Sequence, residues 1–118
     1  MTLPRPQIEL QDGGGCVLLA PFVWTGPEPI TIPAGFFSDG NTIPALVWPG
    51  IGHPYSLSLL RASLCHDYDI ARGLPWEECT RRYRVRLAAS GVGLVRRSLV
   101  IAAVTARGWI RQTGPESR

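Results

Sequence analysis

Residues 56–71 read Ser-Leu-Ser-Leu-Leu-Arg-Ala-Ser-Leu-Cys-His-Asp-Tyr-Asp-Ile-Ala, and this stretch decides the fold. Ser56 can cap the beginning of a helix and Gly73 can end it, because a serine oxygen accepts first-turn amide hydrogens and glycine tolerates the left-handed conformation. The helix is predicted to carry His66 and Asp67 side by side. Adjacent helical positions diverge by about 100°, so we expect the two side chains to serve different purposes.

Two further helices are predicted downstream. Leu74-Pro75 begins the second helix, since proline is tolerated in a first turn. One apolar stripe marks the buried face of this helix: Trp76, Cys79, Tyr83 and Leu87. The third helix is predicted over residues 94–107, with Gly108 as its stop signal. We expect residues 112–118 to form a frayed tail.

The N-terminal half has the composition of short strands. Glycine and proline interrupt β-branched and aromatic stretches every few residues, which predicts an antiparallel meander with strands at 7–11, 16–24 and 29–33. No regular pattern follows between Phe36 and Tyr55, and long irregular connections in compact domains are usually functional. The predicted fold class is therefore α+β, in one domain over residues 1–118: a meander over 1–35, a long ordered loop over 36–55 and helices over 56–111.

Length and composition limit the functions available. A chain of 118 residues with 45% hydrophobic and 18% charged residues is long enough for one core and too short for a two-domain enzyme. No apolar run approaches the roughly 20 residues of a membrane span, and the N-terminus lacks the layout of a secretion signal. We therefore expect a soluble protein without a signal peptide or a transmembrane segment.

Charge is distributed unevenly along the chain. Residues 1–55 hold one arginine against four acidic residues, a net charge of −3, whereas residues 56–112 hold ten arginines against four acidic residues, a net charge of +6. Clustered arginines are one signature of binding to nucleic acid or to an anionic surface. No aromatic residues are interleaved with them, so solvated helix faces are the simpler interpretation and a nucleic-acid partner is not expected. The arginines concerned are Arg81, Arg82, Arg84, Arg86, Arg96 and Arg97.

The cysteine content excludes two kinds of site. Cys16, Cys65 and Cys79 are an odd number, and their spacing is not that of zinc ligands. A disulfide framework is therefore not expected. We expect reduced thiols, buried as small apolar side chains.

Two segments could carry chemistry. A neutral imidazole is well matched to general-base work near neutral pH, which makes His66 a candidate base beside Asp67. Asp39-Gly40-Asn41-Thr42 offers a carboxylate, an unhindered backbone and two polar side chains, a composition able to wrap a hard cation. Each segment also has a structural interpretation, a core histidine beside a solvated aspartate in the first case and an Asx turn in the second.

The residues around the second segment carry a resemblance. Residues 30–44 read Ile-Thr-Ile-Pro-Ala-Gly-Phe-Phe-Ser-Asp-Gly-Asn-Thr-Ile-Pro, and Cys65-His66-Asp67-Tyr68 follows. Together they resemble the signature of a small family of unknown function found in phages and prophages, V-P-x-G-F-x-[ST]-D-x-x-[ST]-[IV]-P and then H-D-Y-x-Y. The resemblance covers nearly the whole chain. It implies a phage or prophage accessory protein, located in the host bacterial cytoplasm during phage production or incorporated in the virion.

A second resemblance concerns mechanism. A glycine-containing loop ahead of a helix with His66-Asp67 is similar to the small bacterial phospholipases A2, whose helix carries C-x-x-H-D-x-x-Y. That likeness implies that His66 is a general base, that Asp67 and the carbonyls and carboxylate of Asp39-Gly40 hold calcium, and that lipid or envelope material is the substrate. The supporting residues would be Asn41, Thr42, Tyr68, Asp69, Glu78 and Thr80.

This chain departs from both patterns. It has Ile70 where the phospholipases have tyrosine, and it lacks their paired cysteines. Cys79-Thr80 stands where the phage family usually has Ala-Asp, so the carboxylate that would orient the histidine is missing unless Asp69 or Glu78 substitutes for it. A base without such an acceptor loses much of its power.

Two functions therefore remain open. One is a calcium-dependent hydrolase, weakened by the missing carboxylate or inactive. The other is a non-catalytic virion, tail or morphogenesis component that contacts other phage proteins, in which His66, Asp67 and Asp39 form a structural hydrogen-bond network.

Overall fold

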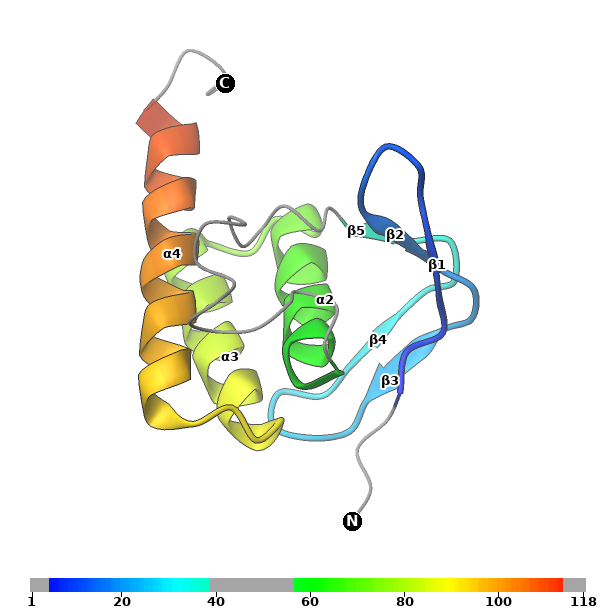
Figure 1. The fold of residues 1–118 in the computed structure, drawn as a ribbon, viewed down its shortest axis with the longest axis horizontal. Coiled ribbons are helices and arrows are strands. Elements are labelled where there is room, and N and C mark those ends of the chain that lie inside the picture. Colours follow the sequence, from blue (N-terminus) through cyan, green and yellow to red (C-terminus); the bar gives the residue numbers. More distant parts are fainter. Residues whose placement is uncertain (1–4, 39–56, 114–118) are drawn as a thin grey trace.

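The computed structural model describes residues 5–38 and 57–113, with side chains described from 59 to 105 in the second range. Five short strands are followed by three helices, so the predicted α+β class is confirmed (Figure 1). The Ser56 cap and the segment Asp39-Gly40-Asn41-Thr42 lie outside the described residues. None of the described helices is long and apolar enough to cross a membrane.

The strands form two small antiparallel sheets. One sheet has the order β1-β2-β5, from β1 (Ile8–Leu10), β2 (Cys16–Leu18) and β5 (Phe37–Ser38). The other pairs β3 (Phe22–Trp24) with β4 (Ile30–Ile32). The strands expected at 7–11 and 29–33 are confirmed with shorter bounds.

The single strand expected over 16–24 is wrong, because β2 and β3 are separate strands in different sheets. Pro21 lies between them and has no amide hydrogen to contribute to a ladder. Just after β2, the Leu19 amide already donates to the carbonyl of Gln7, at 2.8 Å. The chain therefore leaves one sheet before it enters the next.

Strand β5 corrects the expectation that residues 36–55 begin as a loop. Gly35 takes a positive φ of 87°, which reverses the chain after β4. The Leu18 amide then donates to the carbonyl of Phe36, and Ser38 pairs with Cys16 in the register of β2. Two residues are too few to show a periodic pattern, so β5 leaves no signal in the sequence.

The helices are α2 (Leu57–Ala71), α3 (Trp76–Ala89) and α4 (Leu94–Thr113). Gly73 ends α2 with a positive φ of 83°, as predicted. The stop at Gly108 is wrong, and so is the tail at residues 112 and 113, because α4 continues to Thr113. The rest of the predicted tail, 114–118, lies outside the described residues. A single glycine costs a helix about 1 kcal/mol, and the first proline after it comes only at Pro115.

Helix α2 is the middle layer of the molecule, with the strands on one side and α3 and α4 on the other (Figure 1). Leu59 and Ala62 join a core shared with α3 and α4. Leu60, Leu64 and Cys65 join a second core with the strands. An apolar surface on both sides explains why α2 lies between two layers.

Candidate functional site

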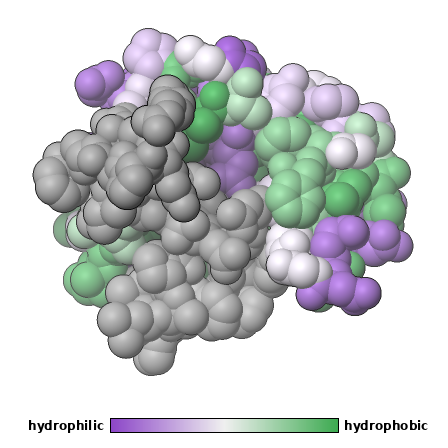
Figure 2. Space-filling view, turned by 90° about the horizontal axis from the view of Figure 1, so that it is seen from above, coloured by the Kyte–Doolittle hydropathy of each residue, from purple (hydrophilic) through white to green (hydrophobic). Residues whose placement is uncertain are grey.

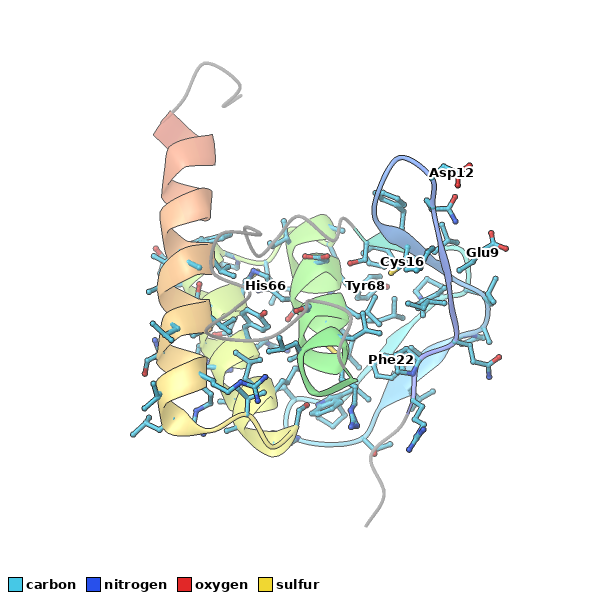
Figure 3. The ribbon with its side chains drawn as sticks, in the orientation of Figure 1. Glu9, Asp12, Cys16, Phe22, His66 and Tyr68 are labelled. Atoms are coloured by element: carbon cyan, nitrogen blue, oxygen red, sulfur yellow. The ribbon has the colours of Figure 1, made fainter. Side chains whose placement is uncertain are left out.

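His66 lies on the side of α2 that faces α3 (Figure 3). Its ring stacks on the ring of Tyr83, with centroids 4.5 Å apart and planes 20° apart. The ring of Trp76 meets it edge-on, with centroids 5.8 Å apart and planes 70° apart. The side chain is 0% exposed. Both contacts come from the apolar stripe that the sequence predicts for the second helix, so the stripe holds the histidine as well as the core.

The two ring nitrogens of His66 have no hydrogen-bond partner among the described residues. Burial lowers the pKa of His66 to about 4, although the Cys79 backbone and the Asp69 carboxylate act in the opposite direction. The imidazole is therefore neutral at pH 7. Aromatic contacts fix the plane of the ring, and the backbone of Cys79 is a polar neighbour of the ring that favours its charged form without a well-formed hydrogen bond to either nitrogen.

Tyr83 lies against the imidazole of His66 and takes no part in proton transfer. Its hydroxyl lies 2.9 Å from the hydroxyl of Ser63, one turn before His66 on α2. Burial raises the pKa of Tyr83, so the phenol stays neutral. Tyr83 thus positions the imidazole by stacking rather than by proton exchange.

Thr80 belongs to the same face of α3. It lies between Trp76 and Tyr83 in the helix, at the spacing that brings all three residues to one side. Its buried Oγ1 has no hydrogen-bond partner among the described residues, just as the His66 nitrogens have none. The phage pattern usually has aspartate where this chain has Thr80. A carboxylate at this position could accept a hydrogen bond from the imidazole of His66.

We expect Thr80→Asp to raise the pKa of His66 from about 4 toward the ordinary value of about 6.5. A carboxylate beside the ring stabilises the imidazolium form. Titration of the His66 ring by NMR measures the change, with Thr80→Asn as the uncharged control. An unchanged midpoint in Thr80→Asp would show that residue 80 does not face the imidazole.

Asp67 points to the strands instead of α3. Its Oδ2 accepts a hydrogen bond from the hydroxyl of Ser38 at the end of β5. Burial raises the pKa of the Cys16 thiol on β2, and the charge of Asp67 raises it further. Ser38 directly precedes the predicted cation segment that begins with Asp39. His66 and Asp67 therefore meet different partners, as adjacent helical positions predict. The last residue of β5, Ser38, lies next to the carboxylate of Asp67.

Asp69 and Tyr68 have neighbours other than His66. Both oxygens of the fully buried Asp69 carboxylate accept from arginine, one from Arg86 at 2.7 Å and the other from Arg72 at 2.7 Å. Tyr68 packs edge-on against Phe36, with centroids 5.3 Å apart. Among the described contacts, no hydrogen bond joins Asp69 to the imidazole.

Glu78 is held on the outer side of α3. It accepts hydrogen bonds from Arg81 at 2.7 Å and from Arg82 at 2.8 Å, and these bonds lower the pKa of Glu78 to about 2. Neither Asp69 nor Glu78 takes the place of the missing carboxylate in the described structure.

No group of three or more His, Cys, Asp or Glu residues that could hold a metal occurs in the described ranges. Asp67 is the one described member of the predicted calcium set, so residues 5–38 and 57–105 do not by themselves complete a cation site. The three cysteines are free and buried, as predicted, and burial raises the pKa of the Cys65 thiol to about 12.

Sequence reasoning missed three residues of this region. Ser38 could have been found as the [ST] that precedes aspartate in the phage pattern, and Ser63 as the residue one turn before His66. Arg86 was grouped with the solvated arginines, and only its position three residues after Tyr83 in the buried stripe hints that it points inward.

Comparison with known proteins gives two matches. The model of the family described as "Protein of unknown function (DUF1353)" matches residues 16–104, most of this chain. An uncharacterized protein of Sinorhizobium fredii, y4iH, is 33% identical over 72 residues, which are 60% of this chain and 30% of that protein. The chain thus spans less than a third of that relative's length. No solved structure matches, and neither description states an activity.

Proposed function

The chain belongs to the DUF1353 family of proteins of unknown function, and we propose that it is a phage or prophage accessory protein with a His-dependent hydrolytic site of phospholipase-like layout. The observation that carries the proposal is the state of His66. The imidazole is fully buried, held by two aromatic rings, neutral, and without a hydrogen bond at either nitrogen among the described residues.

A purely structural histidine would look different. Buried polar groups are hydrogen-bonded in the great majority of cases, because an unpaired one costs roughly 1–3 kcal/mol. Here Asp67 bonds Ser38 and Asp69 bonds Arg86, so the nearby carboxylates leave the imidazole out of their networks. An apolar ring would fill the same place at lower cost, and the two unpaired nitrogens favour a chemical role.

The chain's own residues define what the site does. Neutral His66 accepts a proton from a water whose oxygen bonds to the ester carbonyl carbon, and it returns that proton to the alcohol oxygen that leaves when the ester C–O bond breaks. Tyr83 and Trp76 hold the ring plane. Because no carboxylate fixes the tautomer of the ring and its pKa is about 4, this base is weak, and we expect slow turnover.

Calcium is part of the proposal through Asp67. The carboxylate of Asp67 would be one ligand, with Asp39 and Gly40 following Ser38 as the others. The ion would supply electrostatic stabilisation of the oxyanion formed from the ester.

The test is release of fatty acid from vesicles of phosphatidylglycerol. We expect release with millimolar calcium, at least a tenfold decrease when EDTA replaces calcium, and a similar decrease for Asp67→Asn. Glu77→Gln, a change of an exposed carboxylate on α3, is the matched control and should keep the wild-type rate. Absence of release with calcium would refute the hydrolase, and release that EDTA leaves unchanged would refute the role of the cation.

A non-catalytic phage component is the second candidate, and the bond between Ser38 and Asp67 favours it. This bond ties β5 to α2 across 29 positions of sequence. If the protein is structural, Ser38→Ala should lower both its unfolding midpoint and its recovery in purified phage particles. Absence of the wild-type protein from the particles would remove this candidate.

A further inference from the structure

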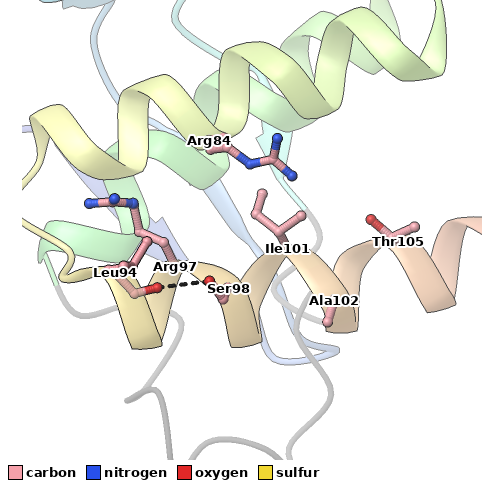
Figure 4. A pocket seen from close by; sticks show the side chains of 7 residues that line it. All are labelled: Arg84, Leu94, Arg97, Ser98, Ile101, Ala102 and Thr105. Carbon is pink, nitrogen blue, oxygen red and sulfur yellow. Dashed lines mark hydrogen bonds between the residues drawn. The ribbon is translucent and has the colours of Figure 1, made fainter.

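Several arginines of the second half have acidic partners among the described residues. Arg81 and Arg82 pair with Glu78, and Arg86 pairs with Asp69. Arg84 and Arg97 have no acidic partner among the described residues. They line a groove between α3 and α4, with Arg84 on α3 and Arg97 on α4 (Figure 4).

The groove offers free hydrogen-bond donors. No acid or carbonyl among the described residues pairs with Arg84. Arg97 donates one hydrogen bond to the carbonyl of Val92, at 3.0 Å, and the rest of its guanidinium has no described partner. A guanidinium group without a carboxylate partner is suited to bind a phosphate or a carboxylate of a ligand.

The remaining walls of the groove are mostly apolar, with Leu94, Ile101 and Ala102 among them. Its volume is about 680 Å³, which is the size of a site for one small molecule or one lipid headgroup rather than of a protein interface. The groove is therefore suited to a ligand that has an anionic group attached to an apolar part.

An apolar strip of α4 continues outside the groove. Leu94, Val95 and Leu99 are 69%, 73% and 47% exposed. Val95, Leu99 and Ala102 are spaced by four and three residues, so they form one line along the helix. Large apolar side chains exposed beside arginines are typical of helices that lie on a membrane surface.

The opposite side of the molecule provides a contrast. The strands also expose apolar side chains, among them Leu10 and Phe37, and the view from above shows an apolar area over this side (Figure 2). The charged residues near β1 include Glu9 and Asp12 (Figure 3) as well as Arg5, and no arginine groove is found on the described strands. Among the described residues, the side of α3 and α4 combines apolar exposure with a groove lined by two arginines.

We propose that the surface formed by Arg84, Leu94, Val95, Arg97 and Leu99 binds anionic phospholipid at a membrane surface. Lipid phosphates would bind the guanidinium groups of Arg84 and Arg97, and the apolar strip would contact the acyl region. This inference rests on the proposed function for the use of the lipid as substrate, but the binding itself does not need His66.

The test is cosedimentation of the full chain with vesicles of phosphatidylcholine alone or with 30% phosphatidylglycerol. We expect binding to the anionic vesicles that weakens at high salt. The double variant Arg84→Gln/Arg97→Gln should bind about 25-fold more weakly, at roughly fivefold for each arginine near an anionic surface. Val95→Ser/Leu99→Ser should also lose at least tenfold.

Matched controls lie on the strand side. Arg5→Gln removes an exposed arginine and Leu10→Ser an exposed leucine far from α4, and both should bind within twofold of the wild type. Equal binding by the double arginine variant, or no binding to anionic vesicles, would overturn the proposal. So would arginine-dependent binding to a single-stranded oligonucleotide without binding to vesicles, because a nucleic acid would then be the ligand.

The two proposals can fail separately. His66→Phe should bind anionic vesicles as tightly as the wild type. Binding without fatty-acid release would reject the hydrolase and keep the lipid surface, whereas release without α4-dependent binding would reject the surface alone.

Discussion

Arg86→Met is expected to lower the free energy of unfolding by about 3–5 kcal/mol, the usual effect of breaking a buried ion pair by removing one partner. Arg86 and Asp69 are both 0% exposed, and their side chains meet at 2.7 Å. Arg86 also donates to the carbonyl of Glu28 at 2.6 Å, where the backbone has a positive φ of 56°. One guanidinium thus joins α2, α3 and the turn between β3 and β4.

Urea unfolding at pH 7 measures this effect. Arg81→Gln removes an exposed arginine paired with Glu78 on the same helix, and it should change the free energy of unfolding by less than about 1 kcal/mol. A loss below 1 kcal/mol for Arg86→Met would show that the pair does not hold the three elements together.

Lowering the pH from 7 to 4 is expected to remove about 3 kcal/mol of stability through His66 alone. The pKa of His66 is about 4 in the folded protein and about 6.5 when unfolded, and each unit corresponds to about 1.4 kcal/mol. Between these values the unfolded chain binds the proton and the folded chain does not. Stability is therefore complete above the unfolded pKa and is lost as the pH falls through the window from about 6.5 to 4.

His66→Phe should abolish this dependence. Phenylalanine keeps the ring between Tyr83 and Trp76 and has no nitrogen to protonate, so its free energy of unfolding should equal or exceed that of the wild type at pH 7. Urea titrations of both proteins at several pH values provide the comparison. A loss of about 1–3 kcal/mol at pH 7 would instead indicate a hydrogen-bonded, structural histidine.

The first two helices could be predicted closely, since the stripe Trp76, Cys79, Tyr83 and Leu87 repeats over several turns and Gly73 gives a clear end, whereas the end of α4 was missed. The strands of the N-terminal half were harder to predict from the sequence. Pro21 divides what composition alone shows as one strand, and β5 consists of two residues paired with β2. Such short pairings depend on tertiary contacts, which no local pattern reports.

The candidate site was predicted in part. Helical spacing correctly separated the directions of His66 and Asp67. Composition could not show that Asp69 and Arg86 pair in the interior, because the same residue types usually lie on the surface. Whether Asp39 joins Asp67 stays a prediction, because Asp39 lies outside the described residues.

The most direct test of a catalytic histidine is the rate of fatty-acid release by wild type and His66→Phe from the same phosphatidylglycerol vesicles with calcium. A chemical role predicts at least a hundredfold lower rate for His66→Phe, in a protein that unfolds no earlier than the wild type. Equal rates, or no release by the wild type, would contradict it.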